Sequence, residues 1–241
     1  MTERIAKFIA RSGVCSRRKA EELIKEKRIT INGEVVTSPA LNVDGTEKIL
    51  LDGEKLPEIE KTRLWIYYKP VGVVTTHSDP QNRPTVFDNL PIGLPRVISV
   101  GRLDLNSEGL LLLTNNGELA RQLELPSNGW SRRYKVRVFG TVNEKKLKNL
   151  ENGVFYDGVQ YGPIKIELES KNGANSWLLI TLSEGKNREI RKLMQSVGLE
   201  VSRLIRLSYG PFQLGSLDKG EVKEVPQKVL YEQMGSKICG L

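Results

Sequence analysis

Two apolar runs on either side of a polar turn constrain the fold of this chain more than any other feature. Residues 97–100 and 110–113 are apolar and have the length of strands, and residues 101–109 between them carry a lone aspartate, Asp104. A carboxylate held between two buried strands would have little freedom and little contact with water. Because such a position is unusual for a charge that does no chemistry, Asp104 is the primary candidate for catalysis. The alternative is a turn residue whose carboxylate caps backbone N–H groups.

Length and composition predict a globular protein of the cytoplasm. The 241 residues, 39% of them hydrophobic, suffice for one large or two modest domains. The apolar runs are too short to span a bilayer, and the N-terminal residues lack the apolar stretch of a signal peptide. Cys15 and Cys239 are far apart in the sequence and fit a reduced chain. With His77 as the one histidine and no Cys/His cluster, the sequence argues against a zinc site and excludes zinc-dependent base deamination.

The charge distribution predicts a polyanionic partner. The formal net charge is +8 at pH 7, and a basic protein of this kind most simply binds nucleic acid, with an ordinary basic surface as the alternative. The cations gather in two segments. Residues 1–33 hold nine Lys and Arg against four Glu, and residues 186–206 hold six against two. Because the positive charge is clustered, we expect a nucleic-acid partner.

The first basic segment predicts two short helices and a hairpin. Apolar residues at helical spacing occupy residues 5–9, Gly13 ends this helix, and Ser16 provides the N-cap of a second one. Three cations fall in the first turn of the second helix, where they oppose the helix dipole: Arg17, Arg18 and Lys19. Together with free backbone N–H groups they form a corner that suits a phosphate. Asn32-Gly33 between two short strand-like runs predicts the hairpin.

This arrangement resembles the S4 RNA-binding domain, with the pattern carried by residues 4–24 and 31–36. The resemblance implies binding to structured RNA and leaves the reaction open. A small helical cap on a neighbouring domain is the alternative interpretation. We assign residues 1–62 to this domain and expect its linker from about residue 52, because residues 52–63 are charged and contain Pro57.

The rest of the chain, residues 63–241, predicts a second domain of mixed α+β class with a largely antiparallel sheet. Strand-like runs alternate with shorter helical ones, and a polar turn at Asn172-Gly173 separates two of the strands. The expected strands are residues 64–74 (broken by a Lys-Pro-x-Gly turn), 134–139, 164–168 and 177–182, and the expected helices are residues 141–150 and 187–197.

The second basic segment begins where a predicted strand ends. Arg191 lies beside its apolar stripe, near the boundary of the core. An arginine there needs a carboxylate, and Asp104 needs a cation to stay ionised, so we expect the two to pair. The other cations of the segment are expected to contact phosphates: Lys186, Arg188 and Lys192.

Two further side chains have more than one interpretation. Tyr134 alternates with Val136 and Val138, which is typical of a core tyrosine, but its ring is also suited to stacking on a base. Glu108 is expected to be solvated or paired with a surface cation. Its spacing from Asp104 also fits a hydrolase that uses two carboxylates.

Three motifs resemble those of the S4-domain pseudouridine synthases of the RsuA type. They are Arg102-Leu103-Asp104 followed by residues 109–114, residues 133–136, and residues 184–191. With the S4 pattern, the resemblance covers nearly the whole chain. It implies an isomerase that converts uridine in RNA to pseudouridine with no cofactor and no metal.

The resemblance also implies a role for each residue. Asp104 would be the catalytic carboxylate, Tyr134 would contact the target base, and Arg191 would form the ion pair with Asp104. Arg102 would help to hold the target nucleotide out of the RNA stack, and Leu204 would pack under the base. The carboxylate would attack C1′ or remove a proton from C2′, and the sequence does not choose between these routes.

Within the family, the pattern is most similar to members that modify large-subunit (23S) ribosomal RNA near the peptidyl-transferase centre, on the strength of residues 117–120, 134–140 and 201–212. The implied partner is ribosomal RNA or a pre-ribosomal particle, bound by a monomer. The alternatives are a small-subunit (16S) ribosomal RNA synthase and a non-catalytic ribosome-binding or assembly factor of the S4 type. Asn116 and Lys186 depart from a frequent aspartate and a frequent arginine, and neither belongs to the implied catalytic trio.

Overall fold

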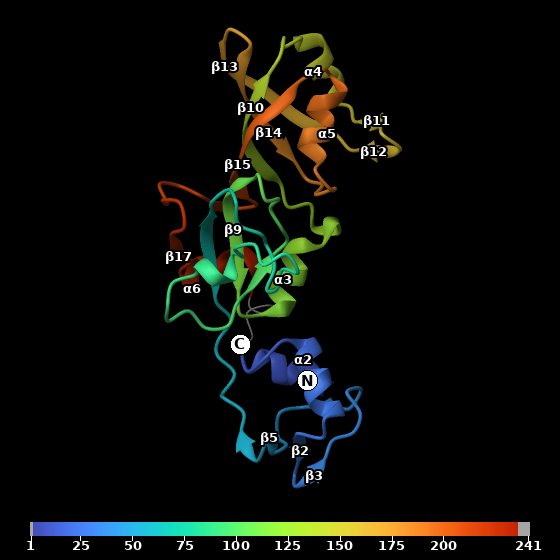
Figure 1. The fold of residues 1–241 in the computed structure, drawn as a ribbon, viewed down its shortest axis with the longest axis vertical. Coiled ribbons are helices and arrows are strands. Elements are labelled where there is room, and N and C mark those ends of the chain that lie inside the picture. The colour runs from blue at the N-terminus through green and yellow to red at the C-terminus, as the bar shows by residue number, and fades with distance from the viewer. Residues whose placement is uncertain (1, 236–241) are drawn as a thin grey trace.

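The chain forms a small N-terminal body and a larger C-terminal body joined by an extended segment, drawn in cyan in Figure 1. The computed structural model describes residues 2–235, and Cys239 lies outside them. Within residues 2–235 we find no helix with the length and apolar character needed to cross a membrane.

The N-terminal body contains the two predicted helices, α1 (Ile5–Arg11) and α2 (Arg17–Lys25). The Ser16 hydroxyl accepts the backbone N–H of Lys19 at 3.1 Å, so the predicted N-cap of α2 is confirmed. The helices share an apolar core with a four-stranded antiparallel sheet of order β3-β2-β5-β6. The strands are β2 (Ile29–Ile31), β3 (Glu34–Val35), β5 (Ile49–Leu51) and β6 (Glu54–Lys55), and a separate pair is formed by β1 (Glu3–Arg4) and β4 (Asn42–Val43).

Two turns fold this small sheet. Asn32 and Gly33 have φ angles of +49° and +92° and join β2 to β3 in the predicted hairpin. Asp52 and Gly53 have φ angles of +51° and +84° and join β5 to β6. The linker expected from about residue 52 therefore begins only after this second hairpin. The Asp-Gly pair is the signal for such a turn, and Arg28 fixes it by donating to both Asp52 carboxylate oxygens at 2.9 and 2.6 Å.

A nine-stranded sheet forms the framework of the large body. Its main path runs β13-β14-β10-β15-β9-β7-β17, with β8 beside β9 and β16 beside β15. Within the described part of the chain, β9 with β15 is the one parallel pair of this sheet, so the predicted α+β class and largely antiparallel sheet are confirmed. The strands are β7 (Leu64–Lys69), β8 (Ile98–Val100), β9 (Glu108–Thr114), β10 (Arg132–Phe139), β13 (Ile164–Asn172), β14 (Asn175–Leu182), β15 (Glu200–Tyr209), β16 (Phe212–Gln213) and β17 (Val222–Glu224), and a separate hairpin is formed by β11 (Val154–Tyr156) and β12 (Val159–Tyr161).

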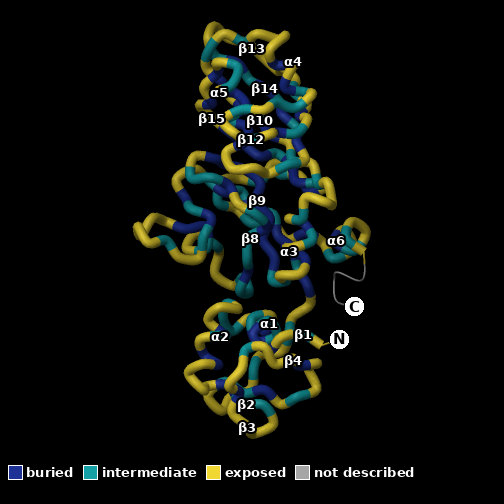
Figure 2. The backbone as a smooth tube through the Cα atoms, turned by 90° about the vertical axis from the view of Figure 1, so that its right-hand side faces the viewer, coloured by how far each residue is buried: buried dark blue, intermediate teal, exposed yellow. Residues whose placement is uncertain are grey.

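Strand β9 lies between two apolar cores and is buried along its whole length (Figure 2). Leu111 and Leu113 belong to the core that includes α4 (Glu144–Leu150) and α5 (Glu189–Ser196). Leu110 and Leu112 belong to the core that includes α3 (Gly117–Glu124) and α6 (Gln227–Met234). Burial on both faces explains why the run at 110–113 is continuously apolar instead of alternating.

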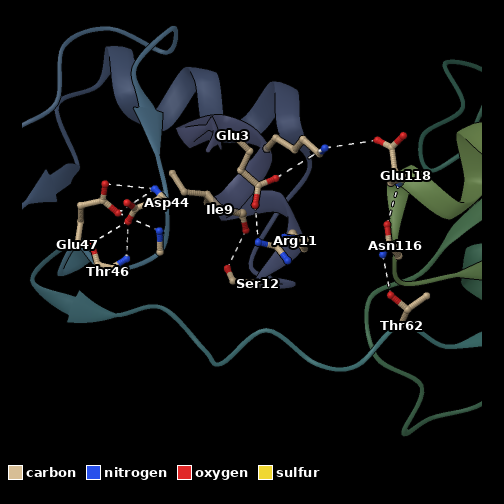
Figure 3. Close-up of polar contacts among 12 residues, drawn as sticks. Glu3, Ile9, Arg11, Ser12, Asp44, Thr46, Glu47, Thr62, Asn116 and Glu118 are labelled. Carbon is tan, nitrogen blue, oxygen red and sulfur yellow. Dashed lines mark hydrogen bonds and ion pairs between the residues drawn. The ribbon is translucent and has the colours of Figure 1, made fainter. Parts of the chain in front are cut away.

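Asn116 connects α3 to the extended segment that precedes β7. Its side-chain oxygen accepts the N–H groups of Glu118 and Leu119 at 2.8 and 3.3 Å, and its amide donates to the Thr62 hydroxyl at 2.7 Å (Figure 3). Glu118 in turn accepts from Lys7 of α1 at 3.4 Å. A polar chain of contacts therefore joins the N-terminal body to the N-terminus of α3.

Candidate active site

A cleft of about 580 Å³ opens beside the turn that carries Asp104. The turn at 101–107 forms one wall, side chains of β10 and β15 form another, and the segment 182–190 that leads into α5 forms a third. Three parts of the chain that are far apart in the sequence therefore meet at one place. The predicted site residues that line this cleft are Arg102, Asp104, Tyr134, Lys186, Arg188 and Leu204.

The Asp104 carboxylate faces this open cleft. Its side chain is 31% exposed, so the expectation of a carboxylate shielded from water between two strands is not met. The reason is that the turn after β8 that carries Asp104 forms a wall of the open cleft, so the neighbouring strands do not enclose the carboxylate. Its ion-pair partner is Arg188, whose Nη1 lies 3.7 Å from Oδ2. Arg188 has a left-handed backbone, with φ of +50°, at the N-terminus of α5.

Lys69 fixes the backbone of the turn that carries Asp104. It ends β7, is fully buried, and its Nζ donates to the carbonyls of Pro70, Asp104 and Ser107 at 3.0, 3.1 and 2.9 Å. Burial lowers the pKa of Lys69 to about 8, although the charges of Asp104 and Glu108 oppose this shift. Lys69 is not among the site residues predicted from the sequence, although a lysine at the end of an apolar strand is a signal that could have identified it.

Arg191 does not form the expected ion pair with Asp104. Its guanidinium donates to the carbonyls of Asn106 and Val201 at 2.8 and 2.9 Å. These acceptors belong to the turn that carries Asp104 and to β15, so Arg191 joins both to α5. Burial, followed by the neighbouring charge of Arg188, lowers the pKa of Arg191, and the Asp104 charge acts in the opposite direction. Arg188, predicted as a phosphate contact, occupies the place expected of Arg191.

Tyr134 and Leu204 form an apolar wall of the cleft. They lie on the neighbouring strands β10 and β15, and both are largely buried. Tyr134 belongs to the main core and also lines the cleft, so its two interpretations are compatible. An aromatic ring beside a leucine provides a flat apolar surface of the kind on which bases stack.

Most of the predicted phosphate contacts have internal partners. Lys186 donates to the Gln160 carbonyl at 2.6 Å and to Glu184, and Lys192 pairs with Asp157 at 2.8 Å. In α2, Lys19 pairs with Glu22 and Arg17 pairs with Glu21, at 3.0 and 3.8 Å. Within residues 2–235, Arg18 and Arg102 are exposed and form no ion pair. Exposed pairs are weak, so an RNA phosphate can compete for these cations.

Glu108 does not face the cleft. Its side chain is buried and pairs with Arg203 and with Lys219 at 3.0 Å, and it accepts from the Tyr68 hydroxyl at 3.2 Å. Burial alone would raise the pKa of Glu108, but the bonds from Arg203 and Lys219 outweigh it and lower the pKa. The expected pairing with a surface cation is therefore present, and the two-carboxylate hydrolase is not supported because Glu108 and Asp104 do not share a cleft. Among the described residues, no group of three or more His, Cys, Asp or Glu side chains is placed to hold a metal ion.

Comparisons with known proteins identify the family. The family model described as RNA pseudouridylate synthase matches residues 63–196, and the S4 domain model matches residues 3–49. An uncharacterized RNA pseudouridine synthase of Rickettsia typhi is 51% identical over 98% of this chain and 96% of its own length. Ribosomal large subunit pseudouridine synthase B of Salmonella typhi is 43% identical over 89% of this chain and 76% of its own length.

A solved structure supports the same relationship. A crystal structure of a pseudouridylate synthase is similar over 94% of this chain and 97% of its own length, with a TM-score of 0.68 and 27% identity. The S4 domain model matches the N-terminal body, and the RNA pseudouridylate synthase model matches the large body and covers more than half of the chain. The chain therefore belongs to the RNA pseudouridine synthase family, enzymes that isomerise uridine in RNA, and carries an S4 domain at its N-terminal end.

Proposed function

We propose that this protein converts one uridine of large-subunit (23S) ribosomal RNA, near the peptidyl-transferase centre, to pseudouridine, and that it acts as a monomer with Asp104 as the catalytic carboxylate. The supporting observation is a cleft that gathers Asp104, Tyr134 and Leu204, in a chain 43% identical to relatives named ribosomal large subunit pseudouridine synthase B. The substrate is the ribosomal RNA itself or a pre-ribosomal particle.

Isomerisation needs a group that acts on the sugar. The bond between uracil N1 and ribose C1′ breaks, the base turns, C5 bonds to C1′, and the C5 proton is then lost. Asp104 acts as the nucleophile at C1′ or as the base at C2′. Both routes require an ionised carboxylate, and Arg188, whose Nη1 lies 3.7 Å from Oδ2, pairs with it and orients it.

The detached uracil must stay in place while it turns. Tyr134 and Leu204 offer their apolar surfaces to the faces of the base. The RNA that carries the target closes the open side of the cleft and so excludes the water that reaches Asp104 in the free protein. Arg102 fills the space that the target base leaves in the RNA stack, and its exposed position on the lining of the cleft supports this role.

The experiment that tests this proposal is primer extension after carbodiimide treatment of both ribosomal RNAs. The RNA comes from cells that lack the gene and are complemented with the wild type, Asp104→Asn or Asp218→Asn. Asp218 is an exposed aspartate outside the cleft and serves as the matched control. We expect one 23S stop that the wild type and the control restore and Asp104→Asn does not. Purified Asp104→Asn should bind 23S RNA within about twofold of the wild type, because only the reacting group has changed.

Other results would replace specific parts of the proposal. A stop in 16S RNA would keep the chemistry and reject the large-subunit target. No change in either RNA would favour the ribosome-binding or assembly factor. Restoration by Asp104→Asn would reject Asp104 as the catalytic carboxylate.

A further inference from the structure

Arg206 is a buried cation that lines the cleft. It lies on β15 with 3% of its surface exposed. Its Nε donates to the Leu110 carbonyl at 2.6 Å, its Nη2 is buried without a hydrogen-bond partner, and no carboxylate of the described residues pairs with it. A buried guanidinium that keeps an unused donor is costly, so a ligand that supplies the missing acceptor would stabilise this arrangement.

The neighbouring arginine of the cleft uses both of its terminal nitrogens for bonds within the protein. Arg132 donates from Nη1 to the carbonyls of Ser183 and Glu184 at 2.8 and 3.0 Å, and from Nη2 to the Tyr209 hydroxyl at 2.7 Å. These bonds fix Arg132 as a structural link between β10, β15 and the segment that leads into α5. Arg206 lies against the same Tyr209 ring, 5.4 Å from its centroid, which restrains its guanidinium but leaves Nη2 free.

The register of the sheet places Arg206 beside the surface proposed for the base. Arg206 pairs directly with Tyr134 across β10 and β15, and Leu204 lies two residues before it on β15. Residues directly opposite one another, or two apart on one strand, share a face of the sheet. Tyr134, Leu204 and Arg206 therefore form one group of two apolar surfaces and one cation, and all three line the cleft.

We propose that Arg206 binds a carbonyl oxygen of the target uracil and stabilises the negative charge that the base acquires when its bond to the ribose breaks. This role rests on the proposed isomerase function and on the cleft that carries Asp104, and it does not depend on which RNA is the target. A uracil carbonyl suits this position better than a phosphate, because Arg206 lies deep beside Tyr134 and Leu204, whereas the exposed Arg102 is at the rim.

The charge balance explains why a cation is useful here. When the N1–C1′ bond breaks, its electron pair leaves with uracil and is shared between N1 and the carbonyl oxygens O2 and O4. This happens whether Asp104 attacks C1′ or removes a proton from C2′. A donor that is fixed at one of these oxygens before the reaction stabilises the uracil anion without reorganising. The base loses its negative charge when an electron pair of the anion forms the bond between C5 and C1′.

The test begins with single-turnover kinetics of Arg206→Met and Arg206→Lys at saturating RNA. Arg137→Met is the matched control, because Arg137 is an exposed residue of β10 that does not line the cleft. Loss of one donor to a developing oxyanion costs about 100-fold in rate, so we expect a fall of this size for Arg206→Met, a smaller one for Arg206→Lys and none for the control. The RNA dissociation constant should stay within about twofold for all three.

The second arm changes the acceptor in place of the donor. RNA with 2-thiouridine or 4-thiouridine at the target position replaces one carbonyl oxygen by sulfur, which accepts hydrogen bonds poorly. We expect one of the two to react more slowly with the wild type and to give no further loss with Arg206→Met, as a coupled pair requires. If Arg206→Met does not fold, Arg206→Lys carries the comparison, and a thio effect of the same size in this variant as in the wild type would overturn the inference.

Three results would overturn the inference. The first is a wild type that converts both thio substrates at the normal rate. The second is a thio effect of equal size in the wild type and in Arg206→Met, because another donor would then bind the oxygen. The third is a variant with a normal rate at saturation, weaker RNA binding and a shallower salt dependence, which would assign Arg206 to a phosphate. Pseudouridine formation by the wild type is measured in every series, so failure of the inference is distinct from failure of the proposed function.

Discussion

Three cations near Asp104 divide two tasks between them. Arg188 contacts the carboxylate, whereas Arg191 and Lys69 bind backbone carbonyls of the turn that carries it. A carboxylate that reacts with the sugar must be ionised and must also be held in place to within a fraction of an ångström. Arg188 orients the carboxylate itself, and the bonds of Arg191 and Lys69 hold the turn that carries it.

Replacement of Lys69 by Met tests the role of the turn. The variant keeps the length of the side chain but leaves the carbonyls of Pro70, Asp104 and Ser107 without their donor. We expect the free energy of unfolding to fall by about 3 kcal/mol and the single-turnover rate to fall as well, because buried unpaired carbonyls are costly and the turn loses its anchor. Urea denaturation and rapid-quench kinetics measure the two effects. Lys223→Met, on the exposed surface of β17, is the matched control, and equal behaviour of the two variants would reject the anchor.

At the scale of elements, the first turn of α5 carries a buried carboxyl group, that of Glu189. Glu189 is buried beside the cleft, and its Oε2 accepts the backbone N–H of Lys186 at 3.0 Å while Oε1 has no partner. Burial, together with the nearby charge of Glu184, raises the pKa of Glu189 to about 6, although the Lys186 N–H opposes this shift. The folded protein therefore holds this proton more tightly than the unfolded chain does.

Stability should consequently depend on pH through Glu189. Between the ordinary pKa of 4.5 and the raised value of about 6, the unfolded chain loses the proton first, so the stabilisation is complete below this window and is lost as the pH rises through it. Glu189→Gln copies the neutral form at every pH. Its free energy of unfolding should exceed that of the wild type by an amount that grows to about 2 kcal/mol above pH 6. Urea denaturation at pH 4.5, 5.5 and 7 measures this, and parallel profiles for the two proteins would contradict it.

The parallel pair of β9 and β15 depends on one glycine. Gly109 has φ of +102°, and a Cβ there would lie 2.4 Å from the Arg206 carbonyl oxygen and 2.7 Å from its nitrogen. Gly109→Ala should lower the free energy of unfolding by about 3 kcal/mol or more, because strain and backbone overlap add. Gly53→Ala is the control, since it has φ of +84° and open space around the added Cβ, and should cost about 1 kcal/mol. Equal losses in thermal or urea unfolding would show that overlap at the strand pair is unimportant.

Local signals predicted the elements well, and long-range contacts were harder to predict. Ser16 and Asn32-Gly33 specify their cap and their turn within a few residues, so sequence reasoning found both. The partner of Asp104 was assigned to Arg191 because a residue type reveals its charge but not its acceptor. The acceptors of Arg191 are backbone carbonyls, which have no signature in the sequence. The same limit concealed Lys69, whose three acceptors all belong to the main chain.

At the scale of the whole molecule, the cations at the start of α2 and the carboxylate that we propose as catalytic lie in different bodies. The exposed cations Arg17 and Arg18 begin α2 in the N-terminal body, and Asp104 lies in the cleft of the large body. The polar contact of Lys7 with Glu118 connects the bodies near the N-terminus of α3. A substitution in α2 should therefore change how tightly the RNA is held and leave the reacting groups in place.

The double substitution Arg17→Gln with Arg18→Gln tests this division. Each lost phosphate contact should reduce the slope of log affinity against log salt by about 1, so the variant should bind RNA more weakly at low salt and approach the wild type at high salt. The single-turnover rate at saturating RNA should be unchanged, because no residue of the cleft is altered. Lys48→Gln with Lys55→Gln removes the same charge from exposed positions of the N-terminal body away from α2 and should change the slope less. Equal slopes for the two double variants would mean that the RNA is held by the net charge of the N-terminal body and not by the corner at the start of α2. A slower rate of Arg17→Gln with Arg18→Gln at saturating RNA would mean that α2 also positions the target.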